Sequence, residues 1–461
     1  MAKFTPCIRW LSGKVVTPRV CIVGAGPAGF YAAHQLIKSS NNIQVDILER
    51  LPVPYGLVRY GVAPDHPEVK NVINTFHKIA TNARVKFLGN VDVGKDVTIN
   101  QLKENYHAVL LTYGAEQDRT LGIPGESLKN VVSGRRFVGW YNGLPSEKDL
   151  TMNLDNQDAV ILGQGNVAID IARILLSPID ELKKTDITSY AIEQLSKSRI
   201  RNVWMVGRRG PLQSAFTIAE LREMTKLQNC KTLWRSDDFI GVNEVIPNLA
   251  RPRKRLTELM IKSMNEMAIN DVKSTKIFAP IFFRGPQEII GDTSVEKVRF
   301  TVNKLIGDDI LNQVAAPTSS IEDISCGIVF RSIGWKSIKI DETIPFDERI
   351  GRVVNSGGKV DDGKLYAAGW VATGPIGVIL STMTNAYQVG KLIVKEIEDN
   401  NVEVKPGTSG LLNILKHSNV PVVSYRDWEK IDAVECERGK KLGKPREKIV
   451  DISEMLKVAF S

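Results

Sequence analysis

The sequence of 461 residues has few cysteines, and no two of them are close enough in the chain to form a local site. There are five, Cys7, Cys21, Cys230, Cys326 and Cys436, an odd number with no C-x-x-C pair. This spacing excludes a secreted disulfide framework, a redox-active dithiol, a zinc ribbon and an iron–sulfur cluster bound within the chain. The five histidines also lack metal-ligand spacing, so we expect no metal site.

Long hydrophobic runs are missing as well. No uninterrupted apolar stretch approaches the roughly 18 residues of a membrane-spanning helix, so we expect no transmembrane segment. The rest of the composition, 43% hydrophobic and 25% charged, is that of a folded globular chain and excludes a disordered or collagen-like one. At the usual ~150 residues per domain, the length indicates two to three domains.

Acidic residues are absent from the first 45 positions, which carry five basic ones. Residues 1–18 resemble a mitochondrial targeting leader in composition, and they lack the continuous apolar core of a secretory signal. An untargeted flexible tail is the alternative. A second basic stretch, residues 199–255, holds twelve basic and five acidic side chains. These two stretches together exceed the net charge of +9, so the basic character is local.

A dinucleotide-binding pattern follows the first predicted strand. Residues 19–29 (RVCIVGAGPAG) combine a buried strand with G-x-G-x-x-G, and a helical pattern follows. Gly24 allows a tight turn, Gly26 lets the backbone approach a pyrophosphate, and Gly29 lets the helix pack on the strand. The next strand pattern ends at Glu49, an acid that can accept hydrogen bonds from ribose hydroxyls. This predicts a site for a nucleotide with a free ribose.

The pattern recurs at residues 159–168 (AVILGQGNVA), with alanine in the third glycine position, as the motif permits. The following strand pattern leads to Arg208 and Arg209, where the first site has Glu49. Guanidinium groups cannot accept a hydrogen bond from a hydroxyl, but they bind a 2′-phosphate well. The second site is therefore predicted to be NADP-specific. The alternative is a solvated arginine pair. The polar stretch 177–198 is predicted to be a helical insertion between helix and strand.

Two nucleotide sites of opposite preference in one chain indicate a flavoprotein that joins FAD to NADPH. Hydride transfer is chemistry of the cofactors, and it requires no side-chain acid or base. We therefore name no catalytic residue.

Several longer segments resemble the adrenodoxin reductase family, the mitochondrial NADPH:ferredoxin oxidoreductases. They are residues 52–70 (PVPYGLVRYGVAPDHPEVK), 137–145 (FVGWYNGLP), 159–175 (AVILGQGNVAIDIARIL), 206–213 (VGRRGPLQ), 251–256 (RPRKRL) and 443–448 (GKPREK). The resemblance covers nearly the whole chain, from about residue 19 to the C-terminus.

The resemblance implies an α/β fold of two Rossmann-like dinucleotide-binding domains in a glutathione-reductase-like layout. In that layout the NADP-binding domain is inserted into the FAD-binding domain. We place the FAD-binding domain at residues 19–116 and 334–461, the NADP-binding domain at 117–333, and the leader at 1–18.

The resemblance also implies which residues contact the cofactors. Besides the first glycine motif, the FAD contacts are Ala28, Glu49, Leu57, Val93, Trp370, Gly377, Val378 and Ile379. The NADP contacts are Gln164, Gly165, Asn166, Val167, Arg208, Arg209 and Glu220, and Gly377 also approaches the nicotinamide. Without the resemblance, Leu57 and Val93 would be interpreted as core residues.

The electron acceptor implied by the resemblance is an acidic [2Fe–2S] ferredoxin. Arg222, Arg251 and Arg255 match the family's docking positions, and a helix would put the last two on one face. A solvated basic face is the alternative. His66 is interpreted either as close to the partner face or as an ordinary loop histidine. The resemblance further implies a mitochondrial monomer that supplies haem-thiolate monooxygenases or iron–sulfur cluster assembly.

Two other functions fit parts of the sequence. A flavin monooxygenase also begins with hydride transfer to FAD, and it would consume oxygen without a ferredoxin. A nucleic-acid-binding protein that senses NADPH would use the basic stretch for salt-sensitive binding. The sequence contains no nucleic-acid-binding module to support that second function, so we expect no nucleic-acid partner.

Overall fold

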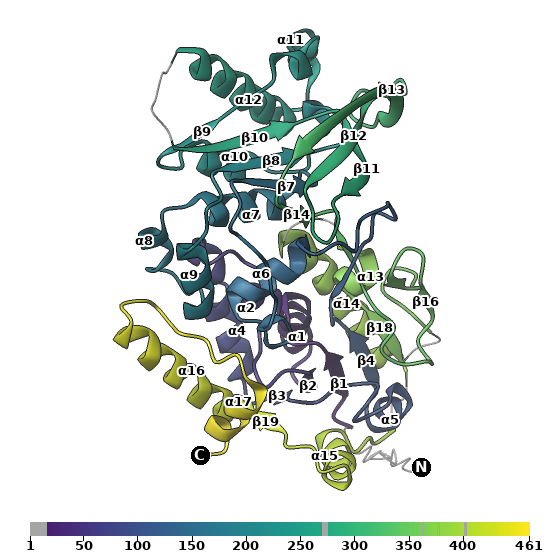
Figure 1. Ribbon diagram of the computed structural model, residues 1–461. Helices are drawn as coiled ribbons and strands as arrows, with labels where there is room; N and C mark the ends of the chain where they lie inside the picture. The colour runs from purple at the N-terminus through teal and green to yellow at the C-terminus, as the bar shows by residue number, and fades with distance from the viewer. Residues whose placement is uncertain (1–15, 270–274, 362–363, 376, 378, 401–402) are drawn as a thin grey trace, which may run out of the picture. The chain divides into compact units, whose positions relative to one another are not determined.

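The computed structural model describes residues 16–269, 275–361, 364–375, 377, 379–400 and 403–461 (Figure 1). The chain forms two compact units. The first comprises residues 1–55, 74–115 and 337–425, and the second comprises residues 56–73, 116–336 and 426–461. Residues 1–15 of the predicted leader lie outside the described residues.

The first unit is built on a six-stranded sheet with the order β18-β4-β1-β2-β3-β19. The strands are β1 (Arg19–Val23), β2 (Gln44–Glu49), β3 (Val85–Gly89), β4 (Ala108–Leu111), β18 (Leu365–Ala367) and β19 (Val423–Ser424). All neighbours are parallel except β19, which runs antiparallel to β3. The chain moves outward from β1 in both directions, so a crevice forms at the carboxyl end of β1, where dinucleotides bind in such sheets.

Helices enclose this sheet because its strands are apolar on both faces. Helix α1 (Pro27–Ser39) packs along α14 (Ile379–Asp399). Helix α5 (Ile99–Asn105) packs on α15 (Thr408–His417), and the two share a core with Cys21 and Val23 of β1. Helix α5 begins at a capping box formed by Thr98 and Gln101, which satisfies amides at its N-terminus.

The second unit repeats this arrangement in an all-parallel sheet with the order β6-β14-β7-β8-β10-β9. Its strands are β6 (Val131–Ser133), β7 (Asp158–Leu162), β8 (Asn202–Val206), β9 (Cys230–Thr232), β10 (Lys276–Ile281) and β14 (Ile328–Arg331). Strand β7 occupies the same position in the strand order of this sheet as β1 does in the sheet of the first unit. A separate antiparallel sheet contains β11 (Arg284–Ile290), β12 (Lys297–Ile306) and β13 (Val314–Ser325).

The helices of the second unit include α6 (Gly134–Asn142), α7 (Asn166–Leu176), α10 (Ile218–Thr225) and α12 (Arg251–Ile269). Helices α6 and α10 each pack on α7, and α12 packs on α10. The predicted insertion at residues 177–198 is confirmed, because α8 (Ile179–Leu182) and α9 (Ser189–Ser196) lie there.

The remaining elements are short helices, two-residue strands and the two helices nearest the C-terminus. They are α2 (Leu57–Tyr60), α3 (Pro67–Lys70), α4 (Ile73–Ala80), α11 (Val242–Val245), α13 (Trp370–Thr373), α16 (Tyr425–Lys441), α17 (Ile452–Ala459), β5 (Gln117–Asp118), β15 (Trp335–Lys336), β16 (Phe346–Asp347) and β17 (Arg352–Val353), with 3-10 turns η1 (Pro145–Glu147), η2 (Pro211–Gln213), η3 (Ser236–Phe239) and η4 (Ile246–Asn248). Within the described residues, no helix combines the length and apolarity that crossing a membrane requires.

A buried ion pair connects the C-terminal helix α16 to α2. Arg59 and Glu435 are 2.5 Å apart, and their side chains are 3% and 0% exposed. Glu435 also pairs with Arg446 at 3.1 Å and accepts the backbone N–H of Ile449 at 2.9 Å. These contacts join residues 56–73 to residues 426–461, and both segments belong to the second compact unit. The predicted domains are defined by the nucleotide that each one binds. Their boundaries therefore stay a prediction.

Candidate functional site

The turn after β1 needs two of its glycines for its own packing. Gly24 has a φ of +110°, and a Cβ there would lie 2.7 Å from Cα of Tyr113. A Cβ on Gly29 would lie 2.2 Å from the carbonyl oxygen of Gly24. No real Cβ tolerates such approaches, so both positions require glycine.

Gly26 differs from the other two, because a Cβ there would meet no atom within 4 Å. Nothing in the protein's own packing requires glycine at this position. Gly26 is also the N-cap residue of α1, and no side chain caps the helix. The N-terminal amides of α1 therefore face open space with the positive end of the helix dipole behind them, an arrangement that suits a pyrophosphate.

Glu49 ends β2 beside this turn. Its carboxylate accepts the backbone N–H of Ala25 at 3.0 Å and that of Leu51 at 3.2 Å. Burial raises the pKa of Glu49, and these backbone hydrogen bonds partly offset that effect. Each carboxylate oxygen has a second lone pair, so the fixed acid can still accept hydrogen bonds from ribose hydroxyls.

A later segment of the chain closes on the same turn. A Cβ on Gly369, which has a φ of +69°, would lie 2.6 Å from Cβ of Ala28. Asn385 of α14 accepts the N–H of Gly369 at 2.7 Å, and Trp370 then opens α13. The structure thus brings Ala28 and the segment leading into Trp370 together within the first unit.

For the other predicted FAD contacts, the structure gives a position but no direct contact with the turn after β1. Val93 is buried in the core that contains Leu48, next to Glu49 in β2. Gly377 is exposed with a φ of +89°, and Leu57 opens α2 in the second compact unit. Val378 and the side chain of Ile379 lie outside the described residues.

The turn after β7 repeats this design. Gly163 has a φ of +128°, and a Cβ there would lie 2.1 Å from the carbonyl oxygen of Ser332. A Cβ on Gly165 would again meet nothing within 4 Å, and Gly165 is the N-cap of α7, which has no side-chain cap. The second turn therefore also directs helix amides toward open space.

Residues of this second turn hold the following loop, residues 207–217, against it. Gln164 donates its side-chain amide to the carbonyl oxygen of Ile281 at 2.9 Å. The backbone carbonyl oxygen of Gln164 accepts the N–H of Ala215 at 3.0 Å. The side chain of Asn166 accepts the N–H of Thr217 at 2.8 Å. Gln164 and Asn166 thus position the loop that carries the two arginines, and Val167 is the second residue of α7.

Arg208 and Arg209 lie in this loop just after β8, and both are exposed. Their backbones are fixed, because Asn303 donates to the carbonyl oxygen of Arg208 at 3.0 Å. The N–H of Phe283 likewise donates to that of Arg209 at 3.0 Å. A fixed backbone with two guanidinium groups toward solvent suits recognition of a phosphate.

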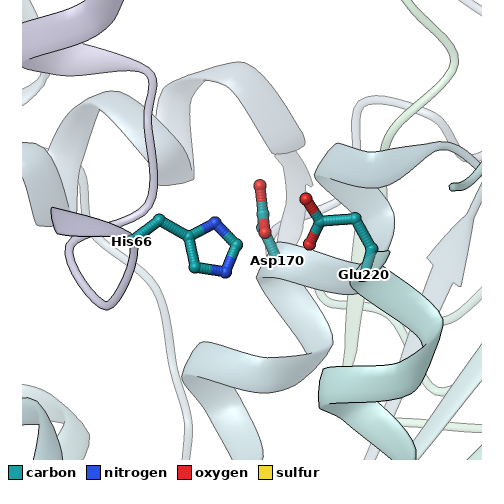
Figure 2. Close-up of side chains that lie close together, drawn as sticks. All are labelled: His66, Asp170 and Glu220. Atoms are coloured by element: carbon teal, nitrogen blue, oxygen red, sulfur yellow. The ribbon is translucent and has the colours of Figure 1, made fainter. Parts of the chain in front are cut away.

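Figure 2 shows a compact cluster in the second unit where His66, Asp170 of α7 and Glu220 of α10 meet. One potential ligand atom from each lies within 4.8 Å of the others. Arg173 supplies the opposite charge, at 2.7 Å from Asp170 and 3.2 Å from Glu220. It also pairs with Asp65 at 2.5 Å. Because a cation already serves these carboxylates, the donor set does not suit a metal ion.

Burial raises the pKa of two acids of this cluster, Asp170 and Glu220. Burial, and then the charge of Asp170, raise the pKa of Glu220 to about 7. Burial also raises the pKa of Asp170, against the effect of Arg173. His66 joins the cluster through Glu223, with Nε2 and Oε2 2.6 Å apart.

Sequence reasoning named Glu220 and His66 but missed the arginine and the other acids of this cluster. Asp65, Asp170, Arg173 and Glu223 come from three separate segments. The available signal was Asp170 and Arg173, two charges three positions apart in the otherwise apolar run AIDIARILL. His66 is not an ordinary loop histidine, because it is only 8% exposed and hydrogen bonded to Glu223.

The three predicted docking arginines lie on neighbouring helices. Arg222 is on α10, Arg251 and Arg255 are on α12, and all three are exposed. Helix α12 runs over Arg251 and Arg255, so the condition for a shared face is met and these two side chains lie one turn apart on one face.

Comparison with known proteins agrees with this picture. Residues 18–203 match the family model described as pyridine nucleotide-disulphide oxidoreductase. Mitochondrial NADPH:adrenodoxin oxidoreductase of Drosophila melanogaster is 51% identical over 96% of this chain and 94% of its own length. The Salvelinus fontinalis enzyme of the same name is 50% identical over 96% and 91%.

Among solved structures, FprA of Mycobacterium tuberculosis in complex with NADPH is 34% identical. It has a TM-score of 0.91 and covers 96% of this chain and 100% of its own.

Proposed function

This chain belongs to the NADPH:adrenodoxin oxidoreductase family and is an oxidoreductase that uses FAD and NADPH, and on that basis we propose that it transfers electrons from NADPH to a small [2Fe–2S] ferredoxin. FAD connects the two halves of this reaction, because a bound flavin accepts a hydride and can release electrons singly.

One observation carries the proposal. The chain contains two strand–turn–helix sites with the same open glycine, at Gly26 and Gly165. The acid Glu49 ends the second strand of one site, and Arg208 and Arg209 follow the equivalent strand of the other. An acid accepts ribose hydroxyls, whereas arginines bind a 2′-phosphate. This pairing suits FAD in the first unit and NADPH in the second.

The residues around each turn bind and orient the cofactors rather than react. The amides at the N-termini of α1 and α7 would hold the two pyrophosphates. Glu49 would orient the FAD ribose, and Gln164 and Asn166 keep the arginine-bearing loop against the second turn. Ala28, Leu57, Val93, Trp370 and residues 377–379 complete the proposed FAD contacts. Val167 and Glu220 complete those to NADP.

The proposed partner surface is formed by Arg222, Arg251 and Arg255. Electron-transfer encounters are small and transient, and charge complementarity raises their association rate. Three exposed cations on two packed helices would attract an acidic ferredoxin. Relatives carry the word mitochondrial in their names, so we propose a mitochondrial matrix enzyme, with or without contact to the inner membrane. Its ferredoxin would supply haem-thiolate monooxygenases, iron–sulfur cluster assembly or both. We further propose that it is a monomer, which light scattering tests.

Stopped-flow spectroscopy under anaerobic conditions tests the whole proposal. Purified protein mixed with NADPH should lose its flavin absorbance, and NADH should bleach it much more slowly. A [2Fe–2S] ferredoxin added next should be reduced. A preparation without flavin, or a reduced protein that leaves the cluster oxidised, would contradict the proposal. Rapid oxygen consumption without ferredoxin would favour a monooxygenase instead.

A further inference from the structure

The basic motif at the start of α12 is divided between two faces of the helix. Arg251 and Arg255 are exposed, whereas Arg253 between them is half-buried. At about 100° per residue, position 253 lies nearly opposite positions 251 and 255. Arg253 therefore does not share the surface proposed for ferredoxin docking, and its position needs a separate explanation.

Arg253 faces the loop that carries Arg208 and Arg209. Its Nη1 donates to the carbonyl oxygen of Ser214 at 2.8 Å and to the Ser214 hydroxyl at 3.2 Å. Ser214 is 2% exposed and donates its hydroxyl to the carbonyl oxygen of Pro211 at 2.8 Å. The guanidinium group is thus held at a fixed place beside this loop by two hydrogen bonds.

The electrostatic neighbour of Arg253 is another cation. Burial lowers the pKa of Arg253, and the positive charge of Arg209 lowers it further. No acid in the described part of the chain contributes to that shift. The two guanidinium groups repel each other, and a phosphate dianion bound beside both would convert this repulsion into attraction.

We propose that Arg253 is a third cation of the 2′-phosphate subsite, next to Arg208 and Arg209, and that its charge strengthens the preference for NADPH over NADH. This inference rests on the proposed NADP specificity of the second unit. It assigns one basic motif to two ligands, with Arg253 directed to the nucleotide and Arg251 and Arg255 to the partner protein.

Calorimetric titration of the FAD-loaded full-length protein with 2′,5′-ADP and with 5′-AMP tests this role. The informative variant is Arg253→Gln, because glutamine keeps a donor for Ser214 but removes the charge. Its affinity for 2′,5′-ADP should fall about tenfold, the usual effect of losing one charge-assisted hydrogen bond. Its affinity for 5′-AMP should not change. Lys254→Gln is the matched control, since it removes one charge from the next position of α12 and should leave both affinities unchanged.

The outcomes separate this inference from the function on which it rests. If the wild-type protein binds 2′,5′-ADP and 5′-AMP equally, the NADP specificity itself is wrong. If the wild type discriminates and Arg253→Gln discriminates equally well, Arg253 is not part of the subsite. Equal loss of both affinities would show that Arg253 only braces the loop, and would also overturn the inference. Should Arg253→Gln fail to retain FAD, Arg253→Met is titrated instead. It removes both the charge and the donor for Ser214, so a selective loss of 2′,5′-ADP affinity supports the inference and an unchanged preference for 2′,5′-ADP overturns it.

Discussion

The side chains that follow the second strand of each unit decide which nucleotide that unit is expected to hold. Glu49 is fixed by two backbone amides, and its remaining lone pairs are those of an acceptor. Arg208 and Arg209 are exposed and can only donate. The two sites share their backbone design, so these few side chains account for the proposed difference in specificity.

Removing the arginine charges should change the nucleotide preference. In Arg208→Gln/Arg209→Gln, KM for NADPH should rise by about 10- to 100-fold, because charge-assisted hydrogen bonds to the 2′-phosphate are lost. KM for NADH should remain near the wild-type value, since NADH has no phosphate there. Steady-state reduction of a dye with each nucleotide measures both constants. A parallel rise for both nucleotides would point to a collapsed loop.

The Glu220 carboxyl predicts a pH dependence of stability. Its pKa in the folded protein is about 7, well above its ordinary value of 4.5. Stability from this group is therefore fully present below pH ~4.5 and is lost as the pH rises through 7. The partly exposed position reduces the effect to about 1 kcal/mol. Thermal unfolding from pH 5 to 8 should show the midpoint of Glu220→Gln rising relative to the wild type. Parallel profiles would contradict the assigned pKa.

At the scale of elements, the two open glycines allow cofactor binding to be separated from folding. Gly26 has φ −85° and ψ −172°, and Gly165 has φ −102° and ψ 179°. Alanine adopts both conformations without strain and would meet no protein atom within 4 Å. A Cβ at either position would instead meet a pyrophosphate.

We therefore expect opposite losses from Gly26→Ala and Gly165→Ala. The first should be purified with at least about tenfold less FAD, and the second should keep FAD but bind NADP⁺ at least about tenfold more weakly. Flavin absorbance and calorimetry measure the two losses, and unfolding of the apoprotein should be unchanged or slightly strengthened in both. Gly29→Ala is the contrasting variant, since its Cβ would meet the Gly24 carbonyl oxygen and should weaken the fold itself.

Helix α16 depends on a buried charge pair. Burial alone would lower the pKa of Arg59, but the Glu435 carboxylate outweighs burial and holds that pKa above its ordinary value. Glu435→Leu should destabilise the second unit by about 3–5 kcal/mol, because Arg59 would be left buried without its counter-ion. The double variant Arg59→Met/Glu435→Leu should recover much of this loss. Denaturant unfolding measures both, and Glu193→Gln in an exposed pair should leave stability almost unchanged.

The elements that could be predicted from the sequence are those set by local spacing. Both strand–turn–helix units and the insertion at residues 177–198 follow from contiguous patterns. The cluster around Arg173 could not be predicted, because its acids come from loops and helices up to 158 positions apart, from Asp65 to Glu223. Only tertiary packing brings them together.

At the scale of the whole molecule, the two proposals assign separate roles to the local basic excess. The stretch 199–255 contains Arg208, Arg209 and Arg253 on one loop and the helix beside it. It also contains Arg222, Arg251 and Arg255 on exposed helix faces. Composition alone could not separate these sets, because the division depends on which side of α12 each residue occupies. The proposed ligands are a nucleotide phosphate for the first set and an acidic protein for the second.

The last prediction concerns Arg251 and Arg255 as part of the proposed docking surface for ferredoxin. In Arg251→Gln/Arg255→Gln, ferredoxin-linked turnover at low salt should fall by about tenfold or more through KM for ferredoxin, because steering by surface charge mainly sets the association rate. NADPH-to-dye activity should be unchanged, since neither residue is proposed to contact a cofactor.

Turnover of the wild type with ferredoxin should decline toward that of the variant as salt screens the charges. The control Lys183→Gln/Lys197→Gln removes the same charge from two exposed positions that directly follow α8 and α9 and should retain ferredoxin turnover. If that control loses as much, net charge alone steers the encounter. If the arginine variant loses dye and ferredoxin activity equally, these arginines do not form a docking surface.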